Sequence, residues 1–315
     1  MLSSTADHLF WMARYTERAE NTARMLDIHL QSSLLAGGRS EAQRSQAANA
    51  LLAISELEPA FKQYNESVDS DTVLRFMVAD ARNGSSIHQA LYAARENARA
   101  VRGAITTELW ETVNITWLEL QKYLEKNAWE QDMGGFFAWV KYRAHLTRGV
   151  TAGTMPRDDA YRFVAMGNAL ERADNVARLL DVKFFEGVSK ELVDWDTKAD
   201  YYHWAAILRS VSGFEIYRKT YRDTITPAKV AELLILRADM PRSLTAAVNA
   251  MCNQLGKLAN KRSGNTQRLA GMLQAELQYG QIDDILKQGL HAYLTKFMER
   301  INAIGAGLSQ DFLVA

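Results

Sequence analysis

A polar stripe runs along one face of the N-terminal segment if that segment is helical. Each residue of an α-helix turns about 100°, so Asn21 stands about 40° and Arg24 about −20° from Glu17. Arg14 follows at about 60°, and Arg18 is next to Glu17 in the chain. A carboxylate beside guanidinium and amide groups can move a proton, bind an amine, or bind a carboxylate or phosphate. The candidate catalytic residue is thus Glu17, and the candidate binding residues are Arg14, Arg18, Asn21 and Arg24.

The same residue types recur in the second half of the chain. Residues 17–28 read ERAENTARMLDI and residues 171–182 read ERADNVARLLDV, with eight of twelve positions identical. Exposed positions tolerate exchange at a cost within about 0.5 kcal/mol, so a solvated face would not be expected to keep Glu, Asn and Arg in both segments. The second segment adds the candidate catalytic residue Glu171 and the candidate binding residues Arg172, Asn175 and Arg178.

Two interpretations of this stripe remain open. In a structural one, the two motif helices lie near a pseudo-two-fold axis, and Glu, Asn and Arg form a hydrogen-bonded network that fixes how the halves pack. Such a network has to be complete, because a buried charge that loses its partner costs about 3–5 kcal/mol. In a functional one, the same groups line a cleft in which Arg binds an anion and Glu binds an amine or moves a proton.

A second charged stripe occurs only in the first half. Arg95, Arg99 and Arg102 recur at helical spacing, with Glu96 beside them. The corresponding stretch 250–260, AMCNQLGKLAN, lacks these arginines. Because like charges on one helix face repel, we expect acidic partners elsewhere in the fold or an anionic ligand. All three arginines are therefore candidate binding residues.

Other kinds of site lack the residues that they need. A di-iron helical bundle uses Glu-x-x-His twice, and the nearest element here is Asp200-x-x-His203. The single cysteine, Cys252, excludes an internal disulfide and a Cys-rich metal site, and we interpret it as a packed residue on a helix face. No Gly-rich phosphate loop and no G-x-S-x-G motif is present. We therefore expect no metal and no cofactor bound by this chain itself.

Composition excludes several classes of partner. The 315 residues are 48% hydrophobic, and Lys+Arg and Asp+Glu number 37 each, so no global field attracts nucleic acid or anionic lipid. The N-terminal residues lack the basic and apolar regions of a signal peptide, and no window approaches the roughly 18 apolar residues of a membrane span. We therefore expect a cytoplasmic chain. Trp139 and Tyr142 fall at helix spacing, which favours core packing for both rings.

The elements that position these residues are predicted to be helices. The chain has four prolines and no segment with a convincing period-2 pattern, so the predicted fold is all-α. In the first half we expect helices from about Ser4 toward Gly37-Gly38, within 41–66, within 71–81, and from Ser86 to about Lys126. We expect links at 127–135, at 153–159, around Trp195 and at 222–227.

Three ordered sequence matches predict a tandem duplication. The motif segment repeats at an offset of 154 residues, and 51–64 matches 208–221 at an offset of 157. A weaker third match at that same offset ends in a serine that could cap the next helix. The shared order indicates two copies of a unit of about 155 residues. We expect a pseudo-two-fold helical bundle with repeat units at 1–152 and 153–315, integrated into one domain.

Several short elements identify a family. They are Glu17-Arg18-Ala19-Glu20-Asn21, Glu171-Arg172-Ala173-Asp174, Glu96-Asn97-Ala98-Arg99-Ala100-Val101-Arg102 with Glu108-Leu109-Trp110-Glu111, and Pro241-Arg242-Ser243. At these residues the sequence resembles the bacterial alpha-E family of uncharacterised helical proteins, named for a Glu-Arg motif, over nearly the whole chain. One departure is Asn83-Gly84-Ser85-Ser86, where an Asn-Pro-x-Ser turn is expected.

The resemblance implies a set of partners. Members of this family tend to accompany a circularly permuted ATP-grasp protein, a transglutaminase-like protease and a proteasome-like peptidase called Anbu. ATP-grasp proteins join a carboxylate to an amine through an acyl phosphate, so the resemblance implies an accessory subunit of an amidoligase system that makes or modifies peptides or amide-linked metabolites, with ATP and Mg on the partner. Two alternatives stay open. One is a stand-alone enzyme on an amide or peptide, with Glu17 or Glu171 as acid/base and Arg24, Arg178 or Arg99 as anion clamp; the other is a purely structural scaffold.

Overall fold

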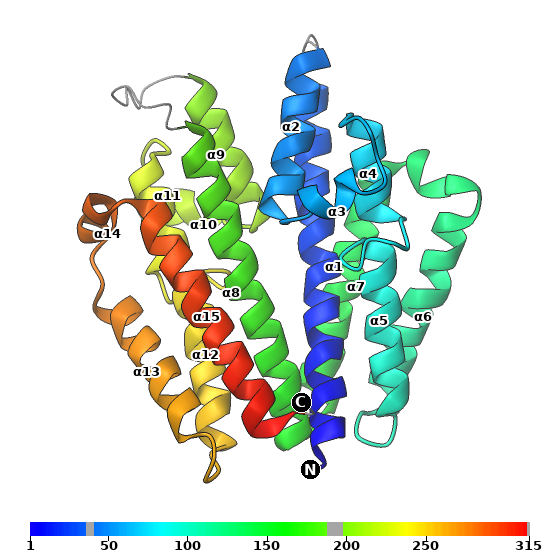
Figure 1. Cartoon of the computed structure of the whole chain (residues 1–315), viewed down its shortest axis with the longest axis vertical. Helices are drawn as coiled ribbons and strands as arrows, with labels where there is room; N and C mark the ends of the chain where they lie inside the picture. Colours follow the sequence, from blue (N-terminus) through cyan, green and yellow to red (C-terminus); the bar gives the residue numbers. More distant parts are fainter. Residues whose placement is uncertain (36–40, 188–197, 314–315) are drawn as a thin grey trace. The chain divides into compact units, whose positions relative to one another are not determined.

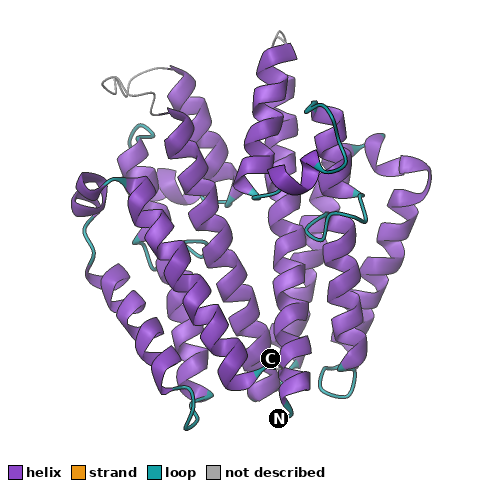
Figure 2. Ribbon diagram, viewed as in Figure 1, coloured by secondary structure: helices purple, strands orange, loops and turns teal. Residues whose placement is uncertain are grey.

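Helices account for all the regular structure that is described. The computed structural model describes residues 1–35, 41–187 and 198–313, and within these ranges the regular elements are α-helices and one 3-10 segment, with no strand (Figure 2). The all-α prediction is confirmed for these residues. The expected stop at Gly37-Gly38 and the loop around Trp195 lie outside them. None of the described helices combines the length and the apolar character that crossing a membrane requires.

Two compact units divide the chain, unit 1 from Met1 to Asn168 and unit 2 from Ala169 to Ala315. The division falls inside helix α8 (Asp159–Gly187), which therefore contributes its first turns to unit 1 and the rest to unit 2. The motif of the second half, which begins at Glu171, lies just after this division.

Unit 1 is built around the long helix α1 (Ser3–Leu35). Helix α1 packs along both α5 (Ile87–Ala100) and α7 (Met133–Thr154), and α6 (Thr107–Leu124) packs against α5 and α7 (Figure 1). The remaining elements of the unit are α2 (Glu41–Ile54), α3 (Glu58–Lys62), α4 (Ser70–Val78) and the 3-10 segment η1 (Glu125–Glu130).

The middle of α1 is buried on more than one face. Apolar residues such as Met12, Ala19 and Leu26 are buried there, and so are the charged residues Glu17 and Glu20. A helix that is buried this completely can keep charges only if they are paired, because desolvation penalises an isolated ion heavily. The geometry of that pairing decides what the motif does.

The long helix predicted from Ser86 to Lys126 is wrong, because the chain turns between α5 and α6. Its start is confirmed, since the Ser86 hydroxyl caps α5 by accepting from the backbone N–H of Gln89 at 3.1 Å. Helix α5 then ends at Ala100, and Thr106 caps a new helix by accepting from the N–H of Leu109 at 3.3 Å. The cap at Thr106 offers the backbone an alternative to continuing the helix.

The helix expected within 41–66 is present as α2, and a second short helix, α3, follows it within the same range. Helix α2 ends at Ile54, Glu56 adopts a left-handed φ of 53°, and α3 begins at Glu58 with Pro59 in its first turn. Proline is tolerated at the start of a helix but cannot continue one, so it favours this break. The expected helix within 71–81 is present as α4, which begins at Ser70 and ends at Val78.

Unit 2 is helical throughout its described residues. After α8 it contains α9 (Lys198–Ser210), α10 (Phe214–Tyr221), α11 (Pro227–Ile235), α12 (Leu244–Lys257), α13 (Gly264–Tyr279), α14 (Ile282–Gln288) and α15 (Leu290–Phe312). Helix α13 packs against α12 and α15. The cap predicted from the third match is confirmed, since Ser243 accepts from the N–H of Ala246 at 2.9 Å at the start of α12.

Candidate functional site

Charged residues of α1 and α7 pair across the interface of these two helices. Lys141 donates to Asp27 at 2.5 Å near one end, and Arg148 donates to Glu17 at 2.9 Å nearer the other, so the two helices run antiparallel. We call this set the α1–α7 charged cluster; it consists of Glu17, Glu20, Arg24, Asp27, Lys141, His145 and Arg148.

The two carboxylates at the centre of the cluster have no exposed surface. The side chains of Glu17 and Glu20 are 0% exposed, and both accept from Nη1 of Arg148. Glu20 also accepts from Nε of Arg24 at 2.9 Å, and Nη2 of Arg24 lies 2.7 Å from the same oxygen. Two buried anions thus meet two guanidinium groups, which is the condition under which buried ions are tolerated.

His145 closes the cluster on its outer side, where its ring is 54% exposed. Nη2 of Arg148 donates to Nδ1 of His145 at 2.8 Å, and Nη2 of Arg24 lies 3.3 Å from Nε2. A neutral imidazole accepts at only one nitrogen, so the shorter contact assigns the acceptor role to Nδ1 and the proton to Nε2. The contact between Arg24 and Nε2 is then not a hydrogen bond. The ring therefore helps to orient Arg148 toward the two carboxylates.

Only some residues of the stripe predicted on α1 lie in the α1–α7 charged cluster. Glu17 and Arg24 belong to one cluster, but they are joined through Glu20 and Arg148. Arg14 and Arg18 instead lie over aromatic rings, at 4.7 Å from the Trp11 centroid and 5.4 Å from the Tyr15 centroid. These are cation–π distances. Asn21 is buried with the cluster residues on α1.

The motif of α8 forms a different arrangement within unit 2. Arg178 donates to both oxygens of Asp174, one turn earlier on the same helix, at 2.8 and 3.0 Å. Asp181 accepts from Nδ1 of His291 on α15 at 2.5 Å. Glu171 is buried, and the remaining candidates, Arg172 and Asn175, are half-buried.

Arg95 and Arg99 pair with an acid of their own helix, Glu96, rather than with an acid elsewhere in the fold as expected. Glu96 accepts from Arg95 at 2.6 Å and from Arg99 at 2.5 Å, and Nε of Arg95 donates to Asn114 of α6 at 3.0 Å. Arg102 does not share their helix, because α5 ends at Ala100. Its guanidinium lies 4.8 Å from the centroid of Trp110 instead. The proposed single stripe is therefore two neighbouring features.

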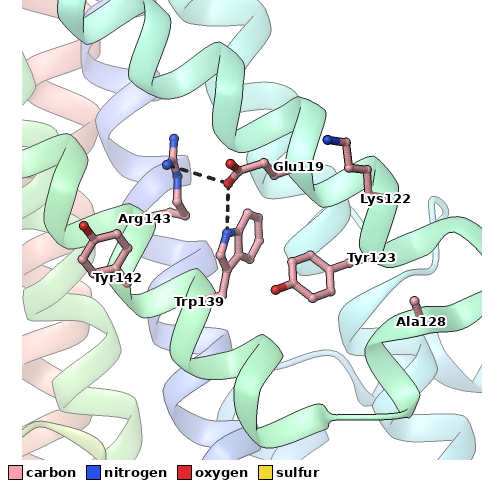
Figure 3. Close-up of a pocket in the computed structure, with 7 residues that line it drawn as sticks. All are labelled: Glu119, Lys122, Tyr123, Ala128, Trp139, Tyr142 and Arg143. Atoms are coloured by element: carbon pink, nitrogen blue, oxygen red, sulfur yellow. Dashed lines mark hydrogen bonds and ion pairs between the residues drawn. The ribbon is translucent and has the colours of Figure 1, made fainter.

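A cavity of about 570 Å³ opens between α6, η1 and α7. Figure 3 shows Glu119 pointing from α6 toward Trp139 and Arg143 of α7, with the Tyr123 ring beside Trp139. The lining residues are Glu119, Lys122, Tyr123, Ala128, Trp139, Tyr142 and Arg143. The interpretation of Tyr142 as a core residue is wrong, since its side chain is 61% exposed at this cavity. A spacing of three residues fits a cavity wall as well as a core.

Several residues of the site were not identified from the sequence. Glu20 stands at the Glu/Asp position of the recurring motif, and that position could have indicated it, because Asp174 keeps the carboxylate in the second motif segment. His145, Arg148 and the cavity residue Glu119 carry no comparable signal, since their spacing on α6 and α7 matches no motif. Only the packing of α1 and α6 against α7 reveals them.

The residues that the structure describes contain no group of His, Cys, Asp and Glu side chains that could hold a metal ion. The side chains of Asp200 and His203, the nearest sequence element to a di-iron motif, lie outside this description. Cys252 is partly buried; its thiol lies 3.5 Å from the carbonyl of Ala270, and burial raises its pKa to about 11. A thiol with a raised pKa is a poor nucleophile at neutral pH, which fits a packed residue.

Comparison with known proteins gives a family and no activity. Residues 1–313 match Alpha-E, described as a predicted alpha-helical domain with a conserved ER motif. The chain is similar to uncharacterised proteins of Mycobacterium bovis and Mycobacterium tuberculosis, with 22% identity over 317 residues that cover 94% of this chain and 35% of each relative. It thus spans about a third of the length of these relatives. No solved structure matches the chain. The family match covers both Glu-Arg pairs, Glu17-Arg18 and Glu171-Arg172, and this chain belongs to the Alpha-E family.

Proposed function

We propose that this chain is an accessory subunit of an ATP-grasp amidoligase system, acting in the cytoplasm on peptides or amide-linked metabolites. In this proposal a circularly permuted ATP-grasp protein holds ATP and Mg and forms the amide bond. This chain docks that protein and presents charged groups to it or to its substrate. The transglutaminase-like protease and the Anbu peptidase would act in the same system.

One observation carries the proposal, namely the burial and pairing of the motif carboxylates of α1. A general acid or base has to lie within hydrogen-bond reach of its substrate. Glu17 and Glu20 are 0% exposed and both accept from Arg148. The motif carboxylates of α1 are therefore better explained as groups that hold α1 against α7 than as reacting groups. This favours an accessory subunit over a stand-alone enzyme that uses Glu17.

The exposed charges of α5 are better suited to a partner. Arg99 is 61% exposed, although it pairs with Glu96, and Arg95 lies next to it. Exposed ion pairs contribute about 1 kcal/mol or less, so a partner carboxylate can replace the internal one at little cost. The relatives support a cooperating role, because in them the matching segment is about a third of a longer chain.

We infer that the two units arose by tandem duplication. Each half of the chain contains eight helical elements in the same order of long and short helices within the described residues, from α1 to α7 with η1 and from α8 to α15. Equivalent helices carry equivalent caps, Ser86 for α5 and Ser243 for α12. A residue with left-handed φ follows α2 at Glu56 and follows α9 at Ser212. The sequence match pairs Ser212 with Ser55, so the structural and sequence alignments differ by one residue at this point.

Co-purification with a circularly permuted ATP-grasp protein from the same organism tests the accessory function. We expect the two proteins to elute as one complex and ATP-dependent amide formation to require both. Full ligase activity without this chain would contradict the proposal.

A charge-reversal pair locates the docking surface. Arg99→Glu on α5 is expected to weaken complex formation at least about tenfold, because it replaces attraction to a partner anion by repulsion. Arg268→Glu, an exposed arginine on α13, is the matched control and should leave the complex intact. If both variants bind and activate the ligase normally, the α5 arginines do not dock a partner.

The scaffold alternative predicts a different result, namely that Arg24→Ala lowers the melting temperature without any separate functional defect.

A further inference from the structure

The cavity between α6, η1 and α7 is separate from the α1–α7 charged cluster. Helix α7 turns Trp139 and Arg143 toward α6, where both contact Glu119, while His145 and Arg148 face α1. The volume of this cavity, about 570 Å³, falls within the range of small-molecule sites, roughly 300–1,000 Å³. The accessory function proposed above does not use it.

Opposite charges stand side by side on the cavity wall. The indole N–H of Trp139 donates to Oε2 of Glu119 at 3.1 Å, and the same oxygen lies 3.7 Å from Nη1 of Arg143. The second distance is too long for a hydrogen bond. Arg143 is held by other groups, since its Nε donates to the Thr116 hydroxyl and its Nη2 to the Thr112 carbonyl, both at 2.8 Å. The guanidinium is thus fixed in place without closing onto Glu119, which is 39% exposed.

Aromatic rings form the rest of the wall. The Tyr123 and Trp139 rings lie 5.0 Å apart at an interplanar angle of 46°, and the exposed Tyr142 also lines the cavity. Rings left open to water favour an apolar ligand group that covers them. Lys122, an exposed residue of α6, supplies a second cation at the same cavity (Figure 3).

From this juxtaposition we propose that the cavity binds a free α-amino acid with an aromatic or large aliphatic side chain. Its ammonium group pairs with Glu119, its carboxylate with Nη1 of Arg143, and its side chain covers Trp139 and Tyr123. In an α-amino acid the ammonium group and the carboxylate are attached to the same carbon, so the two charges lie close together. This matches two protein charges that are separated by 3.7 Å. This proposal does not depend on the accessory function.

Calorimetric titration of the isolated chain with L-phenylalanine tests the proposal. The comparison ligands are L-phenylalanine methyl ester, which keeps only the ammonium charge, and N-acetyl-L-phenylalanine, which keeps only the carboxylate. We expect the free amino acid to bind at least about tenfold tighter than either blocked form, because each blocked form loses charge-assisted hydrogen bonds. Equal or tighter binding of a blocked form overturns the proposal, and so does the absence of binding of both L-phenylalanine and L-leucine.

A matched pair of variants on α6 assigns the site. Glu119→Gln is expected to weaken L-phenylalanine binding at least about tenfold and to abolish its advantage over the N-acetyl form. Glu111→Gln, at an exposed position of the same helix outside the cavity, should bind within about twofold of the wild type. Tyr142→Ala removes an exposed ring and should weaken binding severalfold with unchanged circular dichroism.

Unchanged binding of L-phenylalanine by Glu119→Gln overturns the proposed site. If the chain activates the ligase but binds no amino acid, only the amino-acid site is refuted. If the chain binds the amino acid but does not associate with the ligase, only the accessory function is refuted.

Discussion

The two motif helices carry nearly the same residues but use them differently. In unit 1, the carboxylates of α1 are paired from another helix, with Glu17 and Glu20 both accepting from Arg148 of α7. In unit 2, Asp174 is paired within α8 by Arg178, and Asp181 accepts from His291 of α15. The contact of His291 corresponds to that of Lys141, which pairs with Asp27 in unit 1.

The difference originates in the partner helices. Four and seven residues after Lys141, α7 has His145 and Arg148, whereas α15 has Thr295 and Met298 at the same steps after His291. We therefore expect the Arg148 pairs with Glu17 and Glu20 in unit 1 to contribute more to the free energy of unfolding than the Asp174–Arg178 pair in unit 2. A buried ion pair between helices is costly to break, while a partly exposed pair within one helix contributes a few tenths of a kcal/mol.

The largest effect is expected for Arg148→Ala. Removal of this guanidinium leaves two buried carboxylates without their shared donor, so unit 1 should lose about 3–5 kcal/mol of unfolding free energy in urea denaturation. Met298→Ala on α15 is the matched variant and should cost clearly less, because no buried charge is uncovered. A loss below about 1 kcal/mol for Arg148→Ala would mean that the comparison between the units is wrong.

A pair of glycine substitutions compares the contacts that α8 makes within each unit. A Cβ at Gly167 would lie 2.3 Å from the Phe10 carbonyl of α1, so Gly167→Ala should destabilise the protein by about 1–3 kcal/mol. A Cβ at Gly305 of α15 would lie 3.5 Å from Leu170, an ordinary contact, so Gly305→Ala should be neutral or stabilise by up to about 1 kcal/mol. Thermal unfolding of both variants measures this, and equal shifts in melting temperature would be the contrary result.

The partly buried thiol of Cys252 on α12 should make the stability of unit 2 depend on pH at moderately alkaline values. The folded pKa of Cys252, about 11, is above that of an exposed thiol because burial favours the neutral form. Its contribution to stability is therefore complete below the unfolded pKa and is lost as the pH rises toward 11. Urea denaturation at pH 7.5 and 10.5 should show a larger decrease in stability for the wild type than for Cys252→Ala. An equal decrease in the unfolding free energy of both proteins would exclude a contribution of the Cys252 thiol to the pH dependence.

The smallest effect is expected for Arg99→Ala. Its pair with Glu96 is exposed, so the unfolding free energy should change by less than about 0.5 kcal/mol. Arg95→Ala should cost more, about 1 kcal/mol, since Arg95 also donates to Asn114 of α6. Chemical denaturation of both variants provides the measurement. A larger loss for Arg99→Ala than for Arg95→Ala would reverse the assignment of Arg99 to the surface.

Local features of the fold could be predicted from the sequence. The helix start at Ser86, the cap at Ser243 and the helical content follow from capping chemistry and from the scarcity of breakers, both of which act over a few residues. The break between α5 and α6 was missed, because a threonine cap such as Thr106 gives a weak signal inside a long apolar and charged segment.

The sequence by itself determined the family, the helical class and the two Glu-Arg motifs of this protein. Tertiary structure alone decided which groups those motifs meet. Glu17 and Arg148 are 131 residues apart, and the cavity side chains of Glu119 and Trp139 come from different helices. The physical reason is that pairing of charges and lining of a cavity depend on which helix faces pack together. Packing is fixed by the whole set of side chains in the interface, and no short motif encodes it.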